Sequence, residues 1–564
     1  MGLTDRLAGL YPLPVEPGVE FCRAVRFLDL GARPSAVLAA GYVLSGAGAV
    51  VLASASLLLP PPLRPAGLLV SLASGLVGSY AAGWLPLLLA TAGRTRSLGA
   101  APDLVARAVL RMRVTPAPER AAVFAADSGQ SRLAASLRRH VRAAQPTGNT
   151  GLEAFAAEWE GWFPSLGRAL TLVEAAGSVP SDRREAVLDR ALDTVLDGVR
   201  TRTQAYATSV TAPATALYAF GVLLPTALVA LLPAACTAGV AVTPLSVAVV
   251  YDLLVPAVVL TAGAWLLAHR PVAFPPPRVT PTDMAVDSAV GARTALLVGA
   301  TGAVLGWLGA ARVAPGWAPP LVATGWGVGG ALWVYFRPVL SVHERVHTAE
   351  QALPDALALL GRRVVAGEGV EWAVESVSED ITGPLGDALA AGARRQRRLQ
   401  VGIEAALLGE HGELGRMPSR RLRGSFSIVV LAGREGRPAG EALLSLANHV
   451  ERLQRVEADA RAELDTVCNT LRSTGSVFGP MVAGATVALA AAMTGGEFIG
   501  GPGMPWLGAV VGIYVLILGI LLPALAVGLE RGFDPALVGH AVGKALCVAV
   551  TVYLASYVLA GGVA

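Results

Sequence analysis

Residues 506–528 read WLGAVVGIYVLILGILLPALAVG, an apolar run without a charged side chain. As a helix this run is about 34 Å long, which exceeds the roughly 30 Å hydrocarbon core of a bilayer, so it predicts a membrane-spanning helix. The rest of the chain shares this character, since 54% of its 564 residues are hydrophobic and only 15% are charged. We therefore expect an integral membrane protein rather than a soluble domain.

Further apolar runs of similar length predict an all-α, polytopic protein with about nine transmembrane helices. Residues 1–35 mix acidic and basic side chains, which is typical of a cytosolic amphipathic segment and not of a cleavable signal peptide. The shortest expected span is the fifth. The nine are Ala36–Leu59, Ala66–Ala92, Pro213–Pro233, Ser246–Ala268, Thr294–Ala310, Ala318–Phe336, Ser476–Met493, Trp506–Gly528 and Ala536–Val558.

The arginines predict the orientation of these helices. The connections expected outside carry only Arg64 and Arg312, whereas arginines are frequent in the alternate connections. Because cytoplasmic loops are enriched in Lys and Arg, we expect a multi-pass protein of the cell membrane with its N-terminus inside and its C-terminus outside. The inner arginines that decide this are Arg94, Arg96, Arg107, Arg111, Arg113, Arg270, Arg278, Arg293, Arg337, Arg345, Arg362 and Arg363.

Two inner segments are too long to be loops and predict cytoplasmic domains, residues 93–212 and 337–475. Both show helical apolar stripes, such as Leu353, Leu357, Leu360 and Val364, and we expect several antiparallel helices in each. Helix breaks are expected at Pro116–Pro118, Gln145–Thr150, Pro180, Gly383–Pro384 and Gly433–Pro438. The expected organisation is 1–35 amphipathic segment, 36–92 spans one and two, 93–212 first domain, 213–268 spans three and four, 269–293 cytoplasmic linker, 294–336 spans five and six, 337–475 second domain, and 476–558 spans seven to nine.

The chain also repeats itself. Placing Gly177 over Gly433 aligns Glu185 with Glu441, at an offset of about 256 residues that the flanking spans nearly share. We therefore predict an internal duplication, in which two spans, a helical domain and two more spans occur twice and the ninth span is added. Two such copies would lie parallel, related by an axis along the membrane normal.

Three stretches of the second domain carry a family resemblance: LAGREGRPAGEALLSLANHVERL at 431–453, LPDALALL at 353–360 and GEGVEWAV at 367–374. They resemble the F domain of type II secretion systems, and the fused double unit resembles the archaeal platform proteins of type IV pili and archaella. The first domain departs from the pattern at Ala176–Pro180. The resemblance implies two F-type helical bundles in a non-enzymatic base without a cofactor. It also implies a homodimer that works with a hexameric cytoplasmic ATPase and with pilin or archaellin subunits.

Two sequence features bear on catalysis. The stretch His343-Glu344-Arg345-Val346-His347 has the HExxH form of zinc proteases, so a membrane zinc protease is one alternative. Against it, Arg345 would place a cation in a helix that must pack behind a metal, and the stretch also fits an interfacial helix start. Lys544 has the wrong glycine spacing for a phosphate-binding loop and is followed by alanine, so we expect no nucleotide hydrolysis by the chain itself, in line with the non-enzymatic base that the resemblance implies.

Charged residues of the second domain predict a partner surface. A docking site for the acidic face of the ATPase is one interpretation, and a solvated or lipid-facing surface is the other. No nucleic-acid interface is expected, because the basic residues flank apolar stretches and follow membrane topology. The candidate partner-binding residues are Arg394, Arg395, Arg397, Arg398, Arg420, Arg421, Glu435 and Glu441.

Asp252 is the one acidic residue well inside an expected span. An intramembrane carboxyl is costly, so it predicts either a polar contact to another helix or to a passing pilin, or a near-interface acid beside Tyr251. A transporter built of parallel repeats is a second class of protein that the duplication allows. The spans show almost no other buried charge, and transporters rarely carry two such long polar domains, so the platform is favoured.

Overall fold

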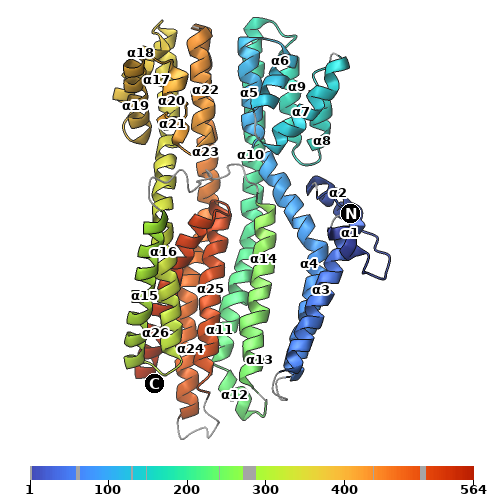
Figure 1. The fold of residues 1–564 in the computed structure, drawn as a ribbon, viewed down its shortest axis with the longest axis vertical. Helices are drawn as coiled ribbons and strands as arrows, with labels where there is room; N and C mark the ends of the chain where they lie inside the picture. Colours follow the sequence, from blue (N-terminus) through green and yellow to red (C-terminus); the bar gives the residue numbers. More distant parts are fainter. Residues whose placement is uncertain are drawn as a thin grey trace. The chain divides into compact units, whose positions relative to one another are not determined.

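The computed structural model describes residues 3–28, 30–58, 64–128, 131–147, 149–240, 242–270, 288–435, 437–495 and 504–563 (Figure 1). Within these ranges every regular element is a helix, which confirms the expected all-α class. The chain forms two compact units. The first comprises Met1–Arg96 with Thr243–Arg270, and the second comprises Ser97–Val242 with Pro271–Ala564.

Eight helices of the described residues are long and apolar enough to cross a membrane, so the chain is a multi-pass membrane protein. The short fifth span is among them, as Gly291–Val313. The expected sixth span, Ala318–Phe336, is helical within α16 (Ala318–Gln351) but is not one of the eight, because glycine, proline and aromatic residues make it less apolar. The ninth crossing therefore stays a prediction.

The first unit holds the N-terminal helices and two groups of apolar helices. Its elements are α1 (Leu3–Ala8), α2 (Val19–Leu28), α3 (Pro34–Leu57), α4 (Arg64–Leu98, to Arg96), α13 (Pro244–Ala248), η4 (Val249–Leu254) and α14 (Val255–His269). Helix α2 packs Phe21 and Val25 against Leu38 of α3. Helices α3 and α4 approach closely because small residues face each other: a Cβ on Gly41 would lie 2.5 Å from the Cβ of Ala82.

The second unit contains two polar helical bundles. The first is formed by α5 (Ala101–Val114), α6 (Pro118–Ser128), α7 (Arg132–Ala144), η2 (Gln145–Thr147), α8 (Leu152–Trp159), α9 (Pro164–Ala175) and the first half of α10 (Ser181–Tyr218). Its core places Leu188 and Val195 of α10 in the buried interior that Leu166 and Val173 of α9 also line. The expected breaks near Pro116, Gln145 and Pro180 are confirmed by the ends of these helices.

The second bundle is formed by α17 (Leu353–Val365), α18 (Val370–Asp380), α19 (Pro384–Leu399), α20 (Ile403–Leu407), α21 (Glu413–Arg416), α22 (Arg420–Glu435) and the first half of α23 (Arg437–Ser473). The expected stripe is confirmed, since Leu353, Leu357, Leu360 and Val364 are all buried in one core. The break expected within Gly433–Pro438 is confirmed by the end of α22 and the start of α23.

The apolar helices of the second unit are α11 (Leu224–Val229), α12 (Leu232–Thr237), α15 (Ser288–Val313), α16, α24 (Gly479–Gly495), α25 (Leu507–Glu530) and α26 (Pro535–Val563). Helix α16 lies beside α15 and α26 (Figure 1). Glycines allow these contacts: a Cβ on Gly299 would lie 2.7 Å from the Gly327 carbonyl, and one on Gly329 would lie 2.8 Å from the Gly543 carbonyl. Backbones in such close approach are typical of helix packing in membranes.

The order of helices is the same in both halves of the chain. Two long helices (α3 and α4, or α15 and α16) precede a series of short helices, and a long helix (α10 or α23) then leads to a further apolar pair. The compact units do not coincide with these halves, because α13–α14 belong to the first unit and α5–α12 to the second. The internal duplication stays a prediction.

Candidate functional site

The two polar bundles meet along α10 and α23. Arg452 of α23 forms an ion pair with Asp193 of α10, and Arg200 Nη2 of α10 lies 3.5 Å from Asp459 Oδ2 of α23. Each helix thus contributes one arginine and one aspartate. All four side chains are at least a third exposed, so these pairs set the register of the two helices more than they stabilise them.

Arg421, a candidate partner residue, is turned inward and held between two carboxylates. Its Nη1 lies 3.7 Å from Glu350 Oε2 of α16 and its Nη2 lies 3.4 Å from Glu457 Oε2 of α23. Ser419 Oγ donates to Glu350 Oε1 at 2.5 Å, and Arg461 Nη2 donates to Glu457 Oε1 at 2.6 Å. This carboxylate clamp, Glu350–Arg421–Glu457, joins three helices.

Burial alone would lower the pKa of Arg421, but the carboxylates of Glu457 and Glu350 raise it further than burial lowers it. The guanidinium therefore stays charged and satisfied within the bundle. Arg421 is thus engaged inside the second bundle, and its expected role in partner binding stays a prediction.

His449 of α23 is buried next to the clamp and has no hydrogen-bond partner on either ring nitrogen among the described residues. Its pKa is lowered to about 4, chiefly by burial. The nearby Asp103 of α5 opposes this shift, and the positive charges of Arg452, Arg421 and Arg113 add to it. The imidazole is therefore neutral at pH 7. It lies in the field of an acid from the first bundle and of arginines from both.

The four arginines of α19 differ from one another in the structure. Arg394 and Arg398 are exposed and form no ion pair with a described residue. Arg397 Nη1 pairs with Glu375 Oε1 of α18 at 2.6 Å, and Arg395 is half-buried. One of the four arginines is thus paired with an acid of α18, and Arg394 and Arg398 remain open to a partner.

The remaining candidate residues belong to α22 and α23. Arg420 and Glu435 belong to α22, and their side chains lie outside the described ones, whereas Glu441 is exposed on α23. Gly440 faces inward: a Cβ there would lie 2.9 Å from the Val365 backbone nitrogen. This glycine therefore lets α23 pack directly on α17.

The HExxH stretch lies in α16 after its apolar part. His343 is buried, with Nε2 3.4 Å from Asp534 Oδ2, and burial lowers its pKa. Asp534 Oδ1 also accepts the Ala536 N–H at 2.8 Å, so it caps α26. His347 Nε2 lies 3.3 Å from the side-chain amide of Gln351. Among the described residues, no group of three or more His, Cys, Asp or Glu side chains is placed to hold a metal ion.

Two continuous helices join the polar bundles to the apolar helices. Helix α10 continues through the π turn η3 (Ala219–Leu223) into α11, and α23 continues through the π turn η6 (Thr474–Phe478) into α24. The two π turns begin 255 residues apart, and each is followed two residues later by a proline, Pro225 or Pro480. Proline lacks an N–H and clashes with the carbonyl four residues earlier, so a wider turn accommodates it.

Helix α25 contacts both π turns. The buried Tyr514 hydroxyl of α25 donates to the Gly221 carbonyl, which is the carbonyl that Pro225 leaves without its helical partner. At the other turn, a Cβ on Gly475 would lie 3.0 Å from the Leu522 Cβ. One apolar helix therefore supports both connecting helices at their irregular points.

Asp252 lies in the first unit, in the π turn η4. Pro256 follows two residues after the end of this turn. Its Oδ1 is buried without a hydrogen-bond partner among the described residues. Both interpretations of this acid stay open.

The chain was compared with protein-family models, curated proteins and solved structures, and none of them matches it.

Sequence reasoning missed the carboxylate clamp and His449. Glu457 and Arg461 at i, i+4 on one helix were a visible signal of a local pair. Nothing in the sequence links them to Arg421, which lies 36 residues earlier than Glu457.

Proposed function

We propose that this protein is the integral membrane platform of a type IV pilus-like assembly or secretion machine, of the kind that builds archaeal pili or archaella. It couples a cytoplasmic hexameric ATPase to the extraction of prepilin subunits from the membrane and to fibre growth. The chain itself is not an enzyme in this proposal, and nucleotide hydrolysis takes place on the partner.

The continuous helices carry this proposal. The helical stretches Ser181–Val229 and Gly440–Met493 contain 49 and 54 residues, so each is a rod of roughly 75–80 Å. Charged residues end at Arg202 in the first rod and at Arg472 in the second, and only uncharged residues follow within each rod. One end of each rod is thus packed in a polar bundle and the other among apolar helices. A load on a bundle is carried along the rod to the membrane.

The arginine distribution supports a cytoplasmic position for both bundles and an outside C-terminus. The recurring helix order supports an internal duplication, and the extended contact of α16 with α15 and α26 supports α16 as the additional crossing. In this topology the exposed Arg394 and Arg398 of α19 face the cytoplasm, where an acidic face of the ATPase can reach them. A homodimer in the cell membrane completes the proposed base.

The proposal is tested in the source cells. Deleting the gene should abolish surface fibres or pseudopilus-dependent secretion, and wild type should restore them. Arg394→Glu with Arg398→Glu should reach the membrane at normal levels but fail to restore fibres, since charge reversal opposes docking. The matched control, Arg394→Lys with Arg398→Lys, keeps the charge and should restore them. Normal fibres in the deletion strain would refute the platform.

A further inference from the structure

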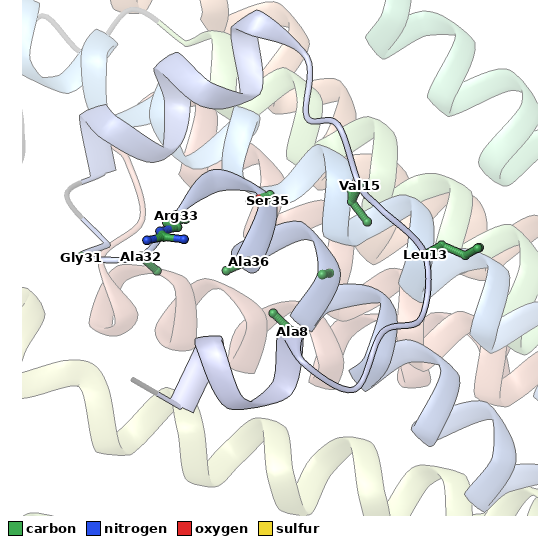
Figure 2. Close-up of a pocket in the computed structure, with 9 residues that line it drawn as sticks. Ala8, Leu13, Val15, Gly31, Ala32, Arg33, Ser35 and Ala36 are labelled. Carbon is green, nitrogen blue, oxygen red and sulfur yellow. The ribbon is translucent and has the colours of Figure 1, made fainter. Parts of the chain in front are cut away.

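The first unit contains a cavity of about 540 Å³ next to its N-terminus. It lies between α1, the segment that follows α1, and the start of α3 (Figure 2). Its volume is in the range of small-molecule sites. Arg33 stands at one end and Leu13 and Val15 at the other (Figure 2). The wall residues used below are Leu13, Val15, Arg33, Ser35, Ala36 and Ala39.

The position of the cavity in the membrane follows from the helices around it. The membrane-spanning stretch of α3 begins at Pro34, and that of α4 ends at Thr95. Arg94 of α4 donates to the Arg23 carbonyl of α2 at 3.3 Å and lies 4.9 Å from the centre of the Phe27 ring. These contacts hold α2 at the level where α3 and α4 leave the hydrocarbon region. The cavity therefore opens at lipid headgroup depth.

Exposed arginines lie at this opening and on the neighbouring helix α2, which also carries the exposed acid Glu20. Arg33 is exposed and forms no ion pair or side-chain hydrogen bond with a described residue, and Arg23 and Arg26 of α2 likewise form no ion pair within the described ranges. Helix α2 buries Phe21 and Val25 while exposing its arginines. This is the pattern of a helix lying in the membrane interface.

We propose that the cavity binds the headgroup of an anionic glycerophosphate lipid. Arg33 and the Ser35 hydroxyl hold the phosphate, and Val15, Ala36 and Ala39 form the apolar wall for the first carbons of the lipid chains. Ala39 lies about 8 Å along α3 from Pro34, which is the step from headgroup to chain region. Leu13, with 64% of its surface exposed, extends this apolar wall. The site is independent of the platform function.

The experiment uses the full-length protein, purified in detergent and stripped of lipid. Dioleoyl phosphatidylglycerol, dioleoyl phosphatidylcholine and inorganic phosphate are titrated separately, with saturable binding followed by native mass spectrometry and by the thermal midpoint. Phosphatidylglycerol should bind at one site and raise the midpoint, and the other two should not. Arg33→Ala should lower the affinity for phosphatidylglycerol about fivefold, which is the effect of one arginine near an anionic surface. Arg33→Lys should retain most of this affinity. Leu13→Asp should also weaken it.

Arg142→Ala, an exposed position on α7 of the first polar bundle and not part of the cavity, is the matched control and should leave the affinity unchanged. Stabilisation by inorganic phosphate equal to that by phosphatidylglycerol would overturn the lipid in favour of a simple anion site. Binding of phosphatidylcholine with the same affinity as phosphatidylglycerol would show that the negative charge of the lipid is not recognised, and would overturn the proposal. An unchanged affinity in both Arg33→Ala and Leu13→Asp would place the lipid elsewhere and overturn the assignment of this cavity.

Discussion

Replacing Arg421 by methionine should destabilise the second bundle more than any exposed arginine change. The substitution keeps an unbranched but shorter side chain and leaves the Glu350 and Glu457 carboxylates without their shared cation. In the structure the side chains of Arg421, Glu350 and Glu457 are 21%, 16% and 14% exposed. Breaking a buried ion pair from one side costs about 3–5 kcal/mol, and this partial access to water favours the lower end, about 3 kcal/mol.

The assay is thermal unfolding of the full-length protein in detergent, followed by tryptophan fluorescence. A loss of about 3 kcal/mol corresponds to a fall in the midpoint of roughly 12–24 °C for a bundle of about 100 residues. Arg423→Met, at an exposed position of the same helix, should change stability by no more than about 0.5 kcal/mol. Adding Glu350→Gln to Arg421→Met should recover part of the loss, because Glu350 keeps no other ion pair with a described residue, whereas Glu457 still pairs with Arg461. Equal shifts for Arg421→Met and Arg423→Met would refute the clamp.

Three further outcomes are expected. Acidification from pH 6.5 towards 4 should lower the stability of the folded protein. In this pH window the unfolded chain takes up a proton at His449, whereas the buried imidazole of the folded protein does not because its pKa is lowered. Thermal melts at a series of pH values check this, and His449→Gln should flatten the dependence of the midpoint on pH. Tyr514→Phe should lower the free energy of unfolding by about 1 kcal/mol, because the Gly221 carbonyl of the π turn loses its donor. Tyr557 of α26, whose ring packs on Trp317, provides the control, and Tyr557→Phe should lower it less in the same melts. A cysteine probe added after Ala564 should react with an impermeant reagent from outside and one at Gln145 should not; the reverse pattern would contradict the orientation.

Much of the helical fold could be predicted because its signals are local. The composition of an uncharged run such as 506–528 is enough to predict that it enters a membrane. The spacing of a stripe such as Leu353, Leu357 and Leu360 is enough to predict which face of a helix is buried. Prolines and glycines marked the ends of the bundle helices for the same reason. The sixth span was harder, because its glycines and tryptophans serve packing against neighbours at the expense of hydropathy.

The candidate site could be predicted only in part, because its contacts join distant parts of the chain. Whether an arginine faces water or carboxylates depends on which helix lies opposite, and Arg421 meets Glu350 only after α16 and α22 pack. Arg394 and Arg397 look alike in sequence, yet only Arg397 reaches Glu375. The cavity at Arg33 forms where the segment after α1 folds back over α3, and no periodic pattern in the sequence predicts this fold-back.

The contacts of α25 support both rods at the points where a proline weakens the helix, which the proposed platform function requires. A π turn beside a proline is the place where a helix bends most easily, since a backbone carbonyl there has lost its partner. Tyr514 supplies a donor at the first turn, and close packing of Gly475 limits movement at the second. Arg472, two residues before the second turn, also pairs with Glu530 at the end of α25. Both rods therefore contact one helix, α25. In the proposed platform, a displacement of either polar bundle would reach the membrane through this helix.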